Sequence, residues 1–221
     1  MSFVEKILTG TYTARRLKPS DPLSIILGTR VSWWDQKDDS SDELTGAATS
    51  RDRTRKSGVV TPYAGVVLDL NDTYSVYASY TDIFMPQEAF NRDRDNKMLE
   101  PDEGQNYEIG LKAEFLDGRL NASAAYFEVH EDNRSISDDE YNDRVPTPDN
   151  YAFKGTQAVT KGYEIEATGE LAPGWQVQAG YTHKIVRDDN NLKISTFEPE
   201  EQVTLYTRYK LTGALDKLTI G

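Results

Sequence analysis

The stretch from Thr61 to Gln87 reads TPYAGVVLDLNDTYSVYASYTDIFMPQ and decides the fold. It holds two runs of alternating side chains, Tyr63 to Leu70 and Tyr74 to Phe84, on either side of Asn71-Asp72. Asn and Asp tolerate the left-handed backbone that a two-residue hairpin turn needs. The stretch therefore predicts one long antiparallel hairpin.

The same pattern of alternating runs and polar breaks recurs along the whole chain. Further strands are expected at 8–17, 23–35, 107–115, 119–129, 161–171, 175–187 and 203–211, with a tenth after residue 216. Short turns are expected at 18–22, 71–72, 117–118, 172–174 and 213–216, and long loops at 36–57, 85–104, 130–160 and 188–200. Short and long connections that alternate predict an all-β, antiparallel up-and-down meander of about ten strands.

Hydropathy separates the classes of membrane protein that are compatible with this chain. The mean hydropathy of the 221 residues is −0.67, and no apolar run approaches the ~20 residues of a membrane-spanning helix. A transmembrane barrel remains compatible, because only alternate residues of its strands face lipid. In the strand at 107–115, Tyr107, Ile109 and Leu111 alternate with Glu108, Gly110 and Lys112, which predicts one lipid-facing and one polar face.

Charge and residue types argue against nucleic-acid binding and against catalysis. The net charge is −12, whereas nucleic-acid binders present a basic face. The chain has no cysteine, and its two histidines, His130 and His183, stand in no known catalytic or metal-binding motif. We therefore expect no enzyme and no cofactor.

Acidic residues raise two further possibilities. The cluster Asp138-Asp139-Glu140 with Asp143 lacks the spacing and the glycine of a calcium loop, so a solvated acidic loop is the favoured interpretation and no metal site is expected. Glu164 and Glu166 share one strand face and have no identifiable partner for acid–base chemistry.

Several spaced motifs carry a family resemblance. They are Thr61-Pro62-Tyr63-Ala64-Gly65, Tyr77-Ala78-Ser79-Tyr80-Thr81, Asn106-Tyr107-Glu108-Ile109-Gly110-Leu111-Lys112, Lys161-Gly162-Tyr163-Glu164-Ile165-Glu166 and Pro173-Gly174-Trp175. In this order they resemble the barrel of TonB-dependent ferric-siderophore receptors of the ferripyoverdine and ferrichrome type. The resemblance runs from about Gly10 to the end of the chain.

The resemblance implies a fold and a location. Residues 1–221 are expected to form one partial barrel domain, the middle-to-late part of a transmembrane barrel of about 22 strands, with the plug domain and the remaining strands outside this sequence. The implied location is the outer membrane of a Gram-negative bacterium, where the barrel contacts lipid. The implied function is TonB-dependent uptake of a ferric siderophore, with iron arriving as part of the ligand.

The resemblance also implies roles for individual residues. Polar residues on the lumenal face are expected to contact the plug; they are Glu108, Lys112, Glu114, Glu164, Glu166 and Arg208. Aromatic and polar residues near the outer rim are expected to bind the siderophore; they are Trp33, Trp34, Tyr80, Phe84, Gln87, Arg134, Tyr141 and Tyr151. Because Trp33 and Trp34 are adjacent, they face opposite sides, and Trp34 is the one expected to face the lumen.

Two alternatives stay open at this point. A passive porin-like or adhesin-like barrel would show the same alternation. A soluble all-β binding module would bury the apolar face against a second sheet. The sequence leaves the identity of any siderophore open.

Overall fold

The computed structural model describes residues 2–41, 48–145, 151–195 and 197–221. Within them the chain forms one sheet in which each strand pairs antiparallel with the next, in the order β1 to β10. The long strands are β1 (Ser2–Ser20), β2 (Leu23–Ser41), β3 (Ala48–Asp69), β4 (Tyr74–Met85), β5 (Asp102–Phe115), β6 (Leu120–Ser137), β7 (Phe153–Ala172), β8 (Trp175–Asp188) and β9 (Glu201–Lys210). Short elements are helix α1 (Asp139–Asn142), the 3-10 turn η2 (Gly213–Leu215) and β10 (Thr219–Ile220). The predicted ten-stranded meander is confirmed.

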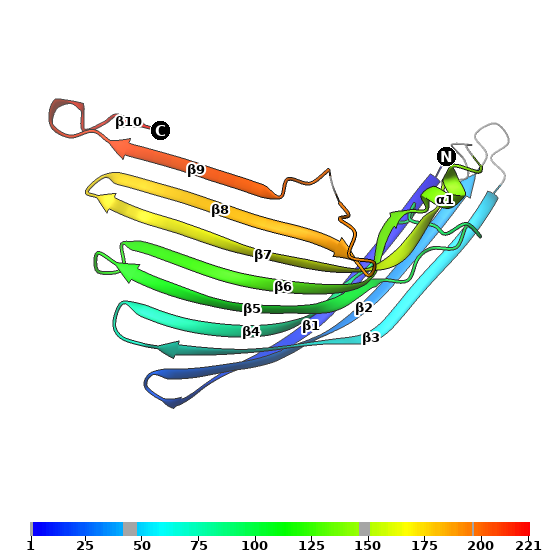
Figure 1. The fold of residues 1–221 in the computed structure, drawn as a ribbon, viewed down its shortest axis with the longest axis horizontal. Coiled ribbons are helices and arrows are strands. Elements are labelled where there is room, and N and C mark those ends of the chain that lie inside the picture. Colours follow the sequence, from blue (N-terminus) through cyan, green and yellow to red (C-terminus); the bar gives the residue numbers. More distant parts are fainter. Residues whose placement is uncertain (1, 42–47, 146–150, 196) are drawn as a thin grey trace.

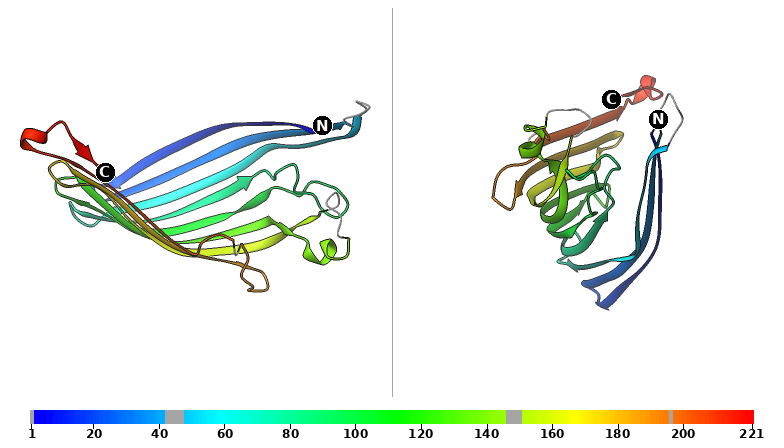
Figure 2. Two further views of the ribbon diagram at one scale, coloured as in Figure 1. Left: turned by 90° about the horizontal axis from the view of Figure 1, so that it is seen from above. Right: turned by 90° about the vertical axis from the view of Figure 1, so that its right-hand side faces the viewer.

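The sheet is an open trough rather than a flat layer. Figure 1 shows the strands side by side, and Figure 2 shows that β1 to β3 turn up along one side of the trough while β6 to β9 form the other. Its short turns lie at one end and its longer connections at the other. Among the described residues, no helix is long and apolar enough to cross a membrane.

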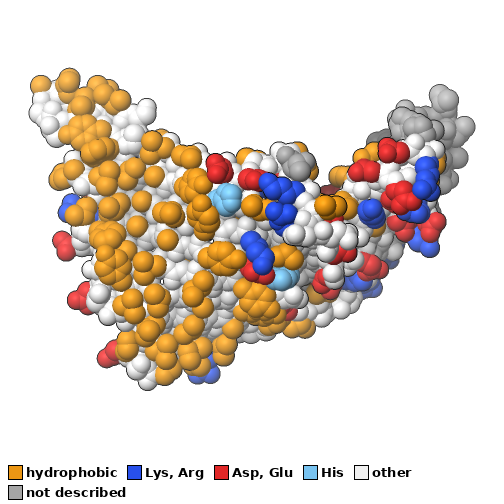
Figure 3. All heavy atoms as spheres, viewed as in Figure 1, with side chains coloured by type: hydrophobic (Ala, Val, Ile, Leu, Met, Phe, Trp, Pro, Cys, Tyr) orange, Lys and Arg blue, Asp and Glu red, His pale blue; other side chains and the backbone are white. Residues whose placement is uncertain are grey.

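Register places apolar and polar side chains on opposite faces, as the alternation predicts. Ile109 pairs with Tyr126, which pairs with Tyr163, and all three are exposed on the convex face. One residue away, Glu108 pairs with Phe127 on the concave face. Figure 3 shows the convex face of the trough with a broad apolar area, whereas charged side chains concentrate toward the end with the long connections.

Aromatic rings cover glycines on the concave face. A Cβ added at Gly28 would lie 2.3 Å from the ring of Tyr63, and one added at Gly110 would lie 2.5 Å from the ring of Tyr77. The rings thus occupy the space that a side chain would need, so a cross-strand aromatic compensates for the missing side chain. This packing holds β2 to β3 and β4 to β5.

The predicted hairpin at 61–87 is present, but its turn differs from the prediction. Neither Asn71 nor Asp72 adopts a positive φ. Instead, the side-chain Oδ1 of Asn71 accepts hydrogen bonds from the backbone N–H groups of Thr73 and Tyr74, at 2.8 and 2.9 Å. The turn is therefore an Asx-type turn, in which the side chain supplies an acceptor that the backbone would otherwise provide.

Two predicted loops are much shorter than expected. The strands β2 and β3 continue their pairing through residues 36–41 and 48–57, so the predicted loop at 36–57 is wrong there, while 42–47 lie outside the described residues. The predicted loop at 130–160 is wrong in the same way, because β6 continues to Ser137 and β7 begins at Phe153. These extensions lack apolar alternation; charged pairs such as Asp35 with Arg53 and Glu5 with Lys37 accompany the pairing. The loops at 85–104 and 188–200 are confirmed with small shifts of their bounds.

Candidate functional site: the joined outer loops

The loop between β4 and β5, residues 86–101, crosses the concave side of the trough and is called the crossing loop here. Five contacts to four strands hold it. Its ties are Glu88 to Lys6 of β1, Arg92 to Asp38 of β2 at 2.6 Å, Met98 Sδ to Gln36 Nε2 of β2 at 3.2 Å, Glu100 to Lys56 of β3 at 2.5 Å, and Gln87 Nε2 to the carbonyl of Asn133 of β6 at 2.8 Å. A loop with partners on both walls of the trough closes part of its width.

Side chains of β2 are buried under the crossing loop. Trp34 is 2% exposed and Gln36 is 1% exposed, although both belong to the concave face of a one-layer sheet. Pro101, at the end of the crossing loop, is also fully buried. The crossing loop thus packs against β2 and shields its concave side chains from solvent.

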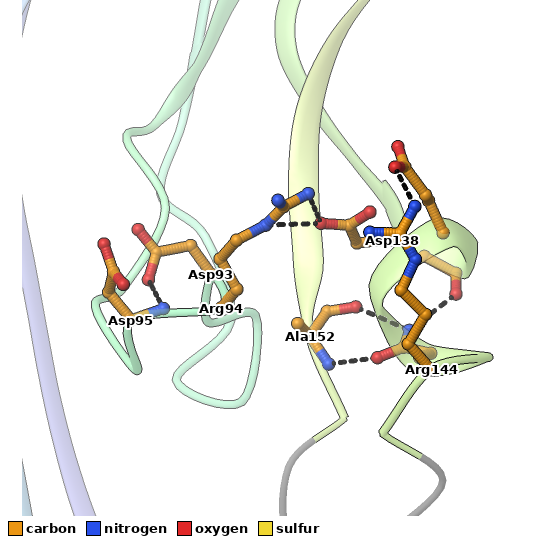
Figure 4. A network of polar contacts seen from close by, with 9 residues as sticks. Asp93, Arg94, Asp95, Asp138, Arg144 and Ala152 are labelled. Atoms are coloured by element: carbon orange, nitrogen blue, oxygen red, sulfur yellow. Dashed lines mark hydrogen bonds and ion pairs between the residues drawn. The ribbon is translucent and has the colours of Figure 1, made fainter.

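An ion pair joins the crossing loop to the connection between β6 and β7. Nε and Nη2 of Arg94 both donate to Oδ2 of Asp138, at 3.1 and 2.6 Å (Figure 4). The guanidinium also lies 5.7 Å from the ring centre of Tyr141 in α1. Burial alone would raise the pKa of Asp138, but the hydrogen bonds and charge of Arg94 outweigh it and lower that pKa below its ordinary value.

The connection itself is braced from within. Asn142 donates to the carbonyl of Ala152 at 2.9 Å and accepts from the N–H of Ala152 at 2.8 Å (Figure 4). The N–H of Phe153 donates to the carbonyl of Arg92 at 2.7 Å. The two loops therefore form one hydrogen-bonded unit.

The loop between β8 and β9 is tied to the same end. Arg134 of β6 donates to Glu131 at 2.8 Å and to Oγ of Ser195 at 3.0 Å, and it lies 3.6 Å from Glu198. Lys184 of β8 also pairs with Glu198, at 2.5 Å. This hydrogen bond, opposed by partial burial and helped by both positive charges, lowers the pKa of Glu198.

Three aromatic rings form a cluster on this unit. Phe90 lies 6.1 Å from Phe153, and Phe153 lies 5.3 Å from Tyr151, between ring centres. Phe90 and Tyr151 are 67% and 53% exposed. Large exposed rings held at this spacing can stack a flat aromatic or amide group of a ligand. Phe90 and Phe153 were missed from the sequence, where Phe90 is a single aromatic within a polar segment and Phe153 follows the predicted Tyr151 by two positions.

The structure divides the predicted siderophore-binding residues between two faces. The joined outer loops are the crossing loop, the connection between β6 and β7, and the loop between β8 and β9. The first group of residues belongs to these loops or to the strand ends beneath them; it consists of Trp34, Gln87, Arg134, Tyr141 and Tyr151. In contrast, Trp33 is the outward neighbour of Trp34, and Tyr80 packs on Tyr107 on the convex face, 5.3 Å between ring centres. Phe84 lies on the same side of β4 as Tyr80. The eight residues do not surround one pocket, and their contact with a ligand stays a prediction.

Within the first group, most polar atoms already have protein partners. The amide of Gln87 donates to Asn133 and accepts from Asn91 at 3.0 Å, and the residue is 6% exposed. Trp34 is buried to a similar degree. These residues therefore hold the loops in place in this conformation, and Tyr151 is the predicted residue that offers an open ring.

The six predicted lumenal residues share the concave face. The register of β4 to β9 places all six on the same side of the sheet as Tyr77 and Gly110. Glu108 accepts a hydrogen bond from Tyr77 at 2.5 Å, and Lys112 lies 4.8 Å above the same ring. Arg208 donates to Gln176 at 2.9 Å. That these residues contact a plug stays a prediction.

Of the acidic cluster predicted to be a solvated loop, Asp139, Glu140 and Asp143 are exposed as expected, and only Asp138 departs from the prediction. Asp138 is buried and paired with Arg94, and Glu140 pairs with Arg144 at 2.7 Å. Among the described residues, no group of three or more His, Cys, Asp or Glu is placed to hold a metal ion.

Comparisons with known proteins agree with this architecture. The family model described as "TonB dependent receptor-like, beta-barrel" matches residues 7–220. The chain is 58% identical over 213 residues to the ferripyoverdine receptor of Pseudomonas aeruginosa, covering 96% of this chain and 25% of that receptor. It is 40% identical to the ferric-pyoverdine BN7/BN8 receptor of Pseudomonas putida, covering 100% of this chain and 26% of that receptor.

Solved structures give the same result. The crystal structure of the P. aeruginosa ferripyoverdine receptor bound to ferripyoverdine superposes with a TM-score of 0.79 at 56% identity, over 98% of this chain and 27% of that one. The alcaligin receptor FauA of Bordetella pertussis superposes with a TM-score of 0.76 at 38% identity, over 99% of this chain and 36% of that one. The chain thus spans about a quarter of the length of the curated relatives it matches. With strand order, register and family match in agreement, the chain belongs to the family of TonB-dependent receptor-like β-barrels.

Proposed function

We propose that this chain is part of an outer-membrane receptor that binds a ferric siderophore of the pyoverdine class and imports it with energy from TonB. The observation that carries the proposal is the 58% identity to a ferripyoverdine receptor over nearly the whole chain. Three further relatives, 38 to 40% identical, are also ferric-pyoverdine receptors. A passive pore or a soluble module has no comparable support.

In this proposal the joined outer loops form part of the mouth that meets the ligand. Ion pairs and backbone hydrogen bonds hold the crossing loop before any ligand arrives, so little ordering entropy is lost on binding. The open rings of Phe90 and Tyr151 supply stacking area, and the iron chelate is cargo that undergoes no covalent chemistry.

The concave face has the separate role of contacting a plug domain, through which TonB acts. Its carboxylates Glu164 and Glu166, with Glu108, suit cationic or hydrogen-bonding partners. The convex face meets the lipid of the outer membrane of a Gram-negative cell, a role that its exposed apolar residues support.

Uptake of radioactive iron tests the proposal directly. A receptor that contains these residues is expressed in a Gram-negative host that lacks its own pyoverdine receptors, and ⁵⁵Fe-ferripyoverdine is supplied with and without a functional TonB. We expect TonB-dependent uptake. Uptake of a ferric catecholate but of no ferripyoverdine would contradict the ligand class, and uptake without TonB would contradict the mechanism.

A further inference from the structure

A groove of about 580 Å³ opens on the convex face, at the border between the apolar area and the charged end. Its floor is apolar and aromatic, formed by Tyr126, Tyr163, Val159 and Ile185, and its rim carries Lys161 and Arg187. Figure 3 shows imidazole and cationic side chains at this border, directly beside the apolar area. The groove faces away from the lumen, so the proposed siderophore site does not use it.

Each of the three carboxylates that line the groove accepts at least one hydrogen bond from a neighbouring residue. Glu128 binds Lys161 at 3.1 Å through one oxygen and His130 at 2.7 Å through the other. Asp188 accepts from the N–H groups of Asn190 and Leu192, at 3.0 and 2.8 Å, within a turn. The carboxylate of Asp189 accepts from the Asn190 side chain at 2.8 Å.

The cations of the groove keep donors to spare. Lys161 has three N–H donors and one carboxylate contact, and Arg187 has five donors and one bond, to the carbonyl of Asn191 at 2.8 Å. The Lys161 side chain is 55% exposed. A phosphate placed between the two cations would gain charge-assisted hydrogen bonds, which are the strong kind.

We propose that this groove binds the phosphorylated headgroup of an outer-leaflet lipid, with the acyl chains lying on the tyrosines and isoleucine below. The inference rests on the proposed outer-membrane location, because only there does the convex face meet lipid. Two features select a lipid over a free anion: the apolar floor, and the continuity of that floor with the exposed Ile109 and Ile165. Glu128 limits the affinity, since it competes for Lys161.

Native mass spectrometry of the detergent-purified receptor that contains these residues tests the proposal. The probes are lipid A with two phosphates and phosphatidylcholine. We expect retention of lipid A over phosphatidylcholine, and a loss of at least about tenfold in lipid A affinity for the double variant Lys161→Gln/Arg187→Gln. The matched control Lys210→Gln/Arg119→Gln removes the same charges at the other end of the strands and should bind as the parent does.

A second variant should change the affinity for lipid A in the opposite direction. Glu128→Gln frees Lys161 and His130, so lipid A should bind several-fold more tightly. A change in the same direction as the double variant would overturn the proposal. Equal retention of the two lipids, or equal losses in the double variant and its control, would also overturn it. Displacement of lipid A by millimolar inorganic phosphate would identify a free-anion site and overturn the lipid assignment.

Ferripyoverdine binding by the same preparations separates the two proposals. The double variant should bind ferripyoverdine like the parent, because its changed residues lie on the face away from the lumen. If the parent binds no ferripyoverdine but still discriminates between the lipids, the proposed function fails and the lipid groove stands. If the parent binds ferripyoverdine without discriminating between the lipids, the lipid-binding proposal is rejected and the proposed function is kept.

Discussion

Arg94 and Asp138 are separated by 44 residues, yet two nitrogens of the Arg94 guanidinium donate to a single carboxylate oxygen of Asp138. The Asp138 side chain is 2% exposed, whereas that of Arg94 is 54% exposed. Breaking the pair therefore costs more at Asp138 than at Arg94, because a buried carboxylate without a partner is destabilising. The pair joins the crossing loop to the connection between β6 and β7.

Removal of the arginine should release that connection. In Arg94→Gln, backbone amides of residues 138–145 should exchange hydrogen roughly tenfold faster, because the lost hydrogen bonds leave Asp138 buried and unpaired. Hydrogen–deuterium exchange of the receptor in detergent measures this change. Arg144→Gln breaks an exposed pair with Glu140 in the same segment and should change exchange little. Equal acceleration in the two variants would contradict the role given to Arg94.

The same pair predicts a dependence on pH. The pKa of Asp138 is lower in the folded loops than in an unfolded chain, so its contribution to stability is present above the unfolded value of about 3.8 and is lost as pH falls through the folded value. Protection of this segment, corrected for intrinsic exchange, should be level from pH 5 to 8 and should fall in more acidic solution. In Arg94→Gln the largest cause that lowers the pKa of Asp138 is removed, so the fall of protection in acidic solution should be smaller or absent. Identical profiles for the parent and the variant would count against the pair as the cause.

The two adjacent tryptophans should respond very differently to truncation. Trp34→Ala removes a buried ring under the crossing loop and should cost about 3–5 kcal/mol of stability. Trp33→Ala removes a ring that is 41% exposed on the convex face, and its cost should be much smaller. Thermal unfolding of both variants in the same detergent provides the comparison. A larger loss for Trp33→Ala would show that the two faces are assigned the wrong way round.

The aromatic cover of Gly110 offers a test of packing on the concave face. In Gly110→Val the new side chain must displace Tyr77 from the glycine and from Glu108, at a cost of about 1–3 kcal/mol. Gly180→Val is the matched control, since nothing lies within 4 Å of the position of its Cβ. Both variants can be compared by thermal unfolding in detergent. A control as unstable as Gly110→Val would mean that glycine in a strand, rather than the tyrosine above it, decides the result.

The central part of each strand could be predicted from sequence because the environment imposes a period of two. Ile109 is exposed on the apolar convex face and Glu108 lies on the polar concave face, so the difference between the two faces appears in the sequence as alternation. Above the apolar area both faces are polar, so the paired segments at 36–41 and 48–57 carry no alternation and resemble loops. A turn at Asn71 was predicted correctly, but its cause was not. The side chain of Asn71 accepts a backbone hydrogen bond, whereas the prediction relied on a left-handed backbone.

The candidate site was harder to predict than the strands. The ties of the crossing loop join residues between 44 and 82 positions apart in the sequence, such as Arg94 with Asp138 and Lys6 with Glu88. Charged residues of both signs are common in exposed loops, so composition gives no sign of which of them pair. Tyr80 and Phe84 were predicted to bind the siderophore near the outer rim, but the face on which they lie follows from the register of β4 with β5, which only the structure supplies.

The central claim is that one face of this sheet meets lipid and the other a polar interior. Spin labels at 109, 165 and 177, on the convex face, and at 108, 164 and 176, on the concave face, test it in the receptor reconstituted in a bilayer. Collision with oxygen, which partitions into lipid, should be high for the first three labels and low for the second three. Equal accessibility of the two sets would contradict the membrane-facing assignment of the convex face.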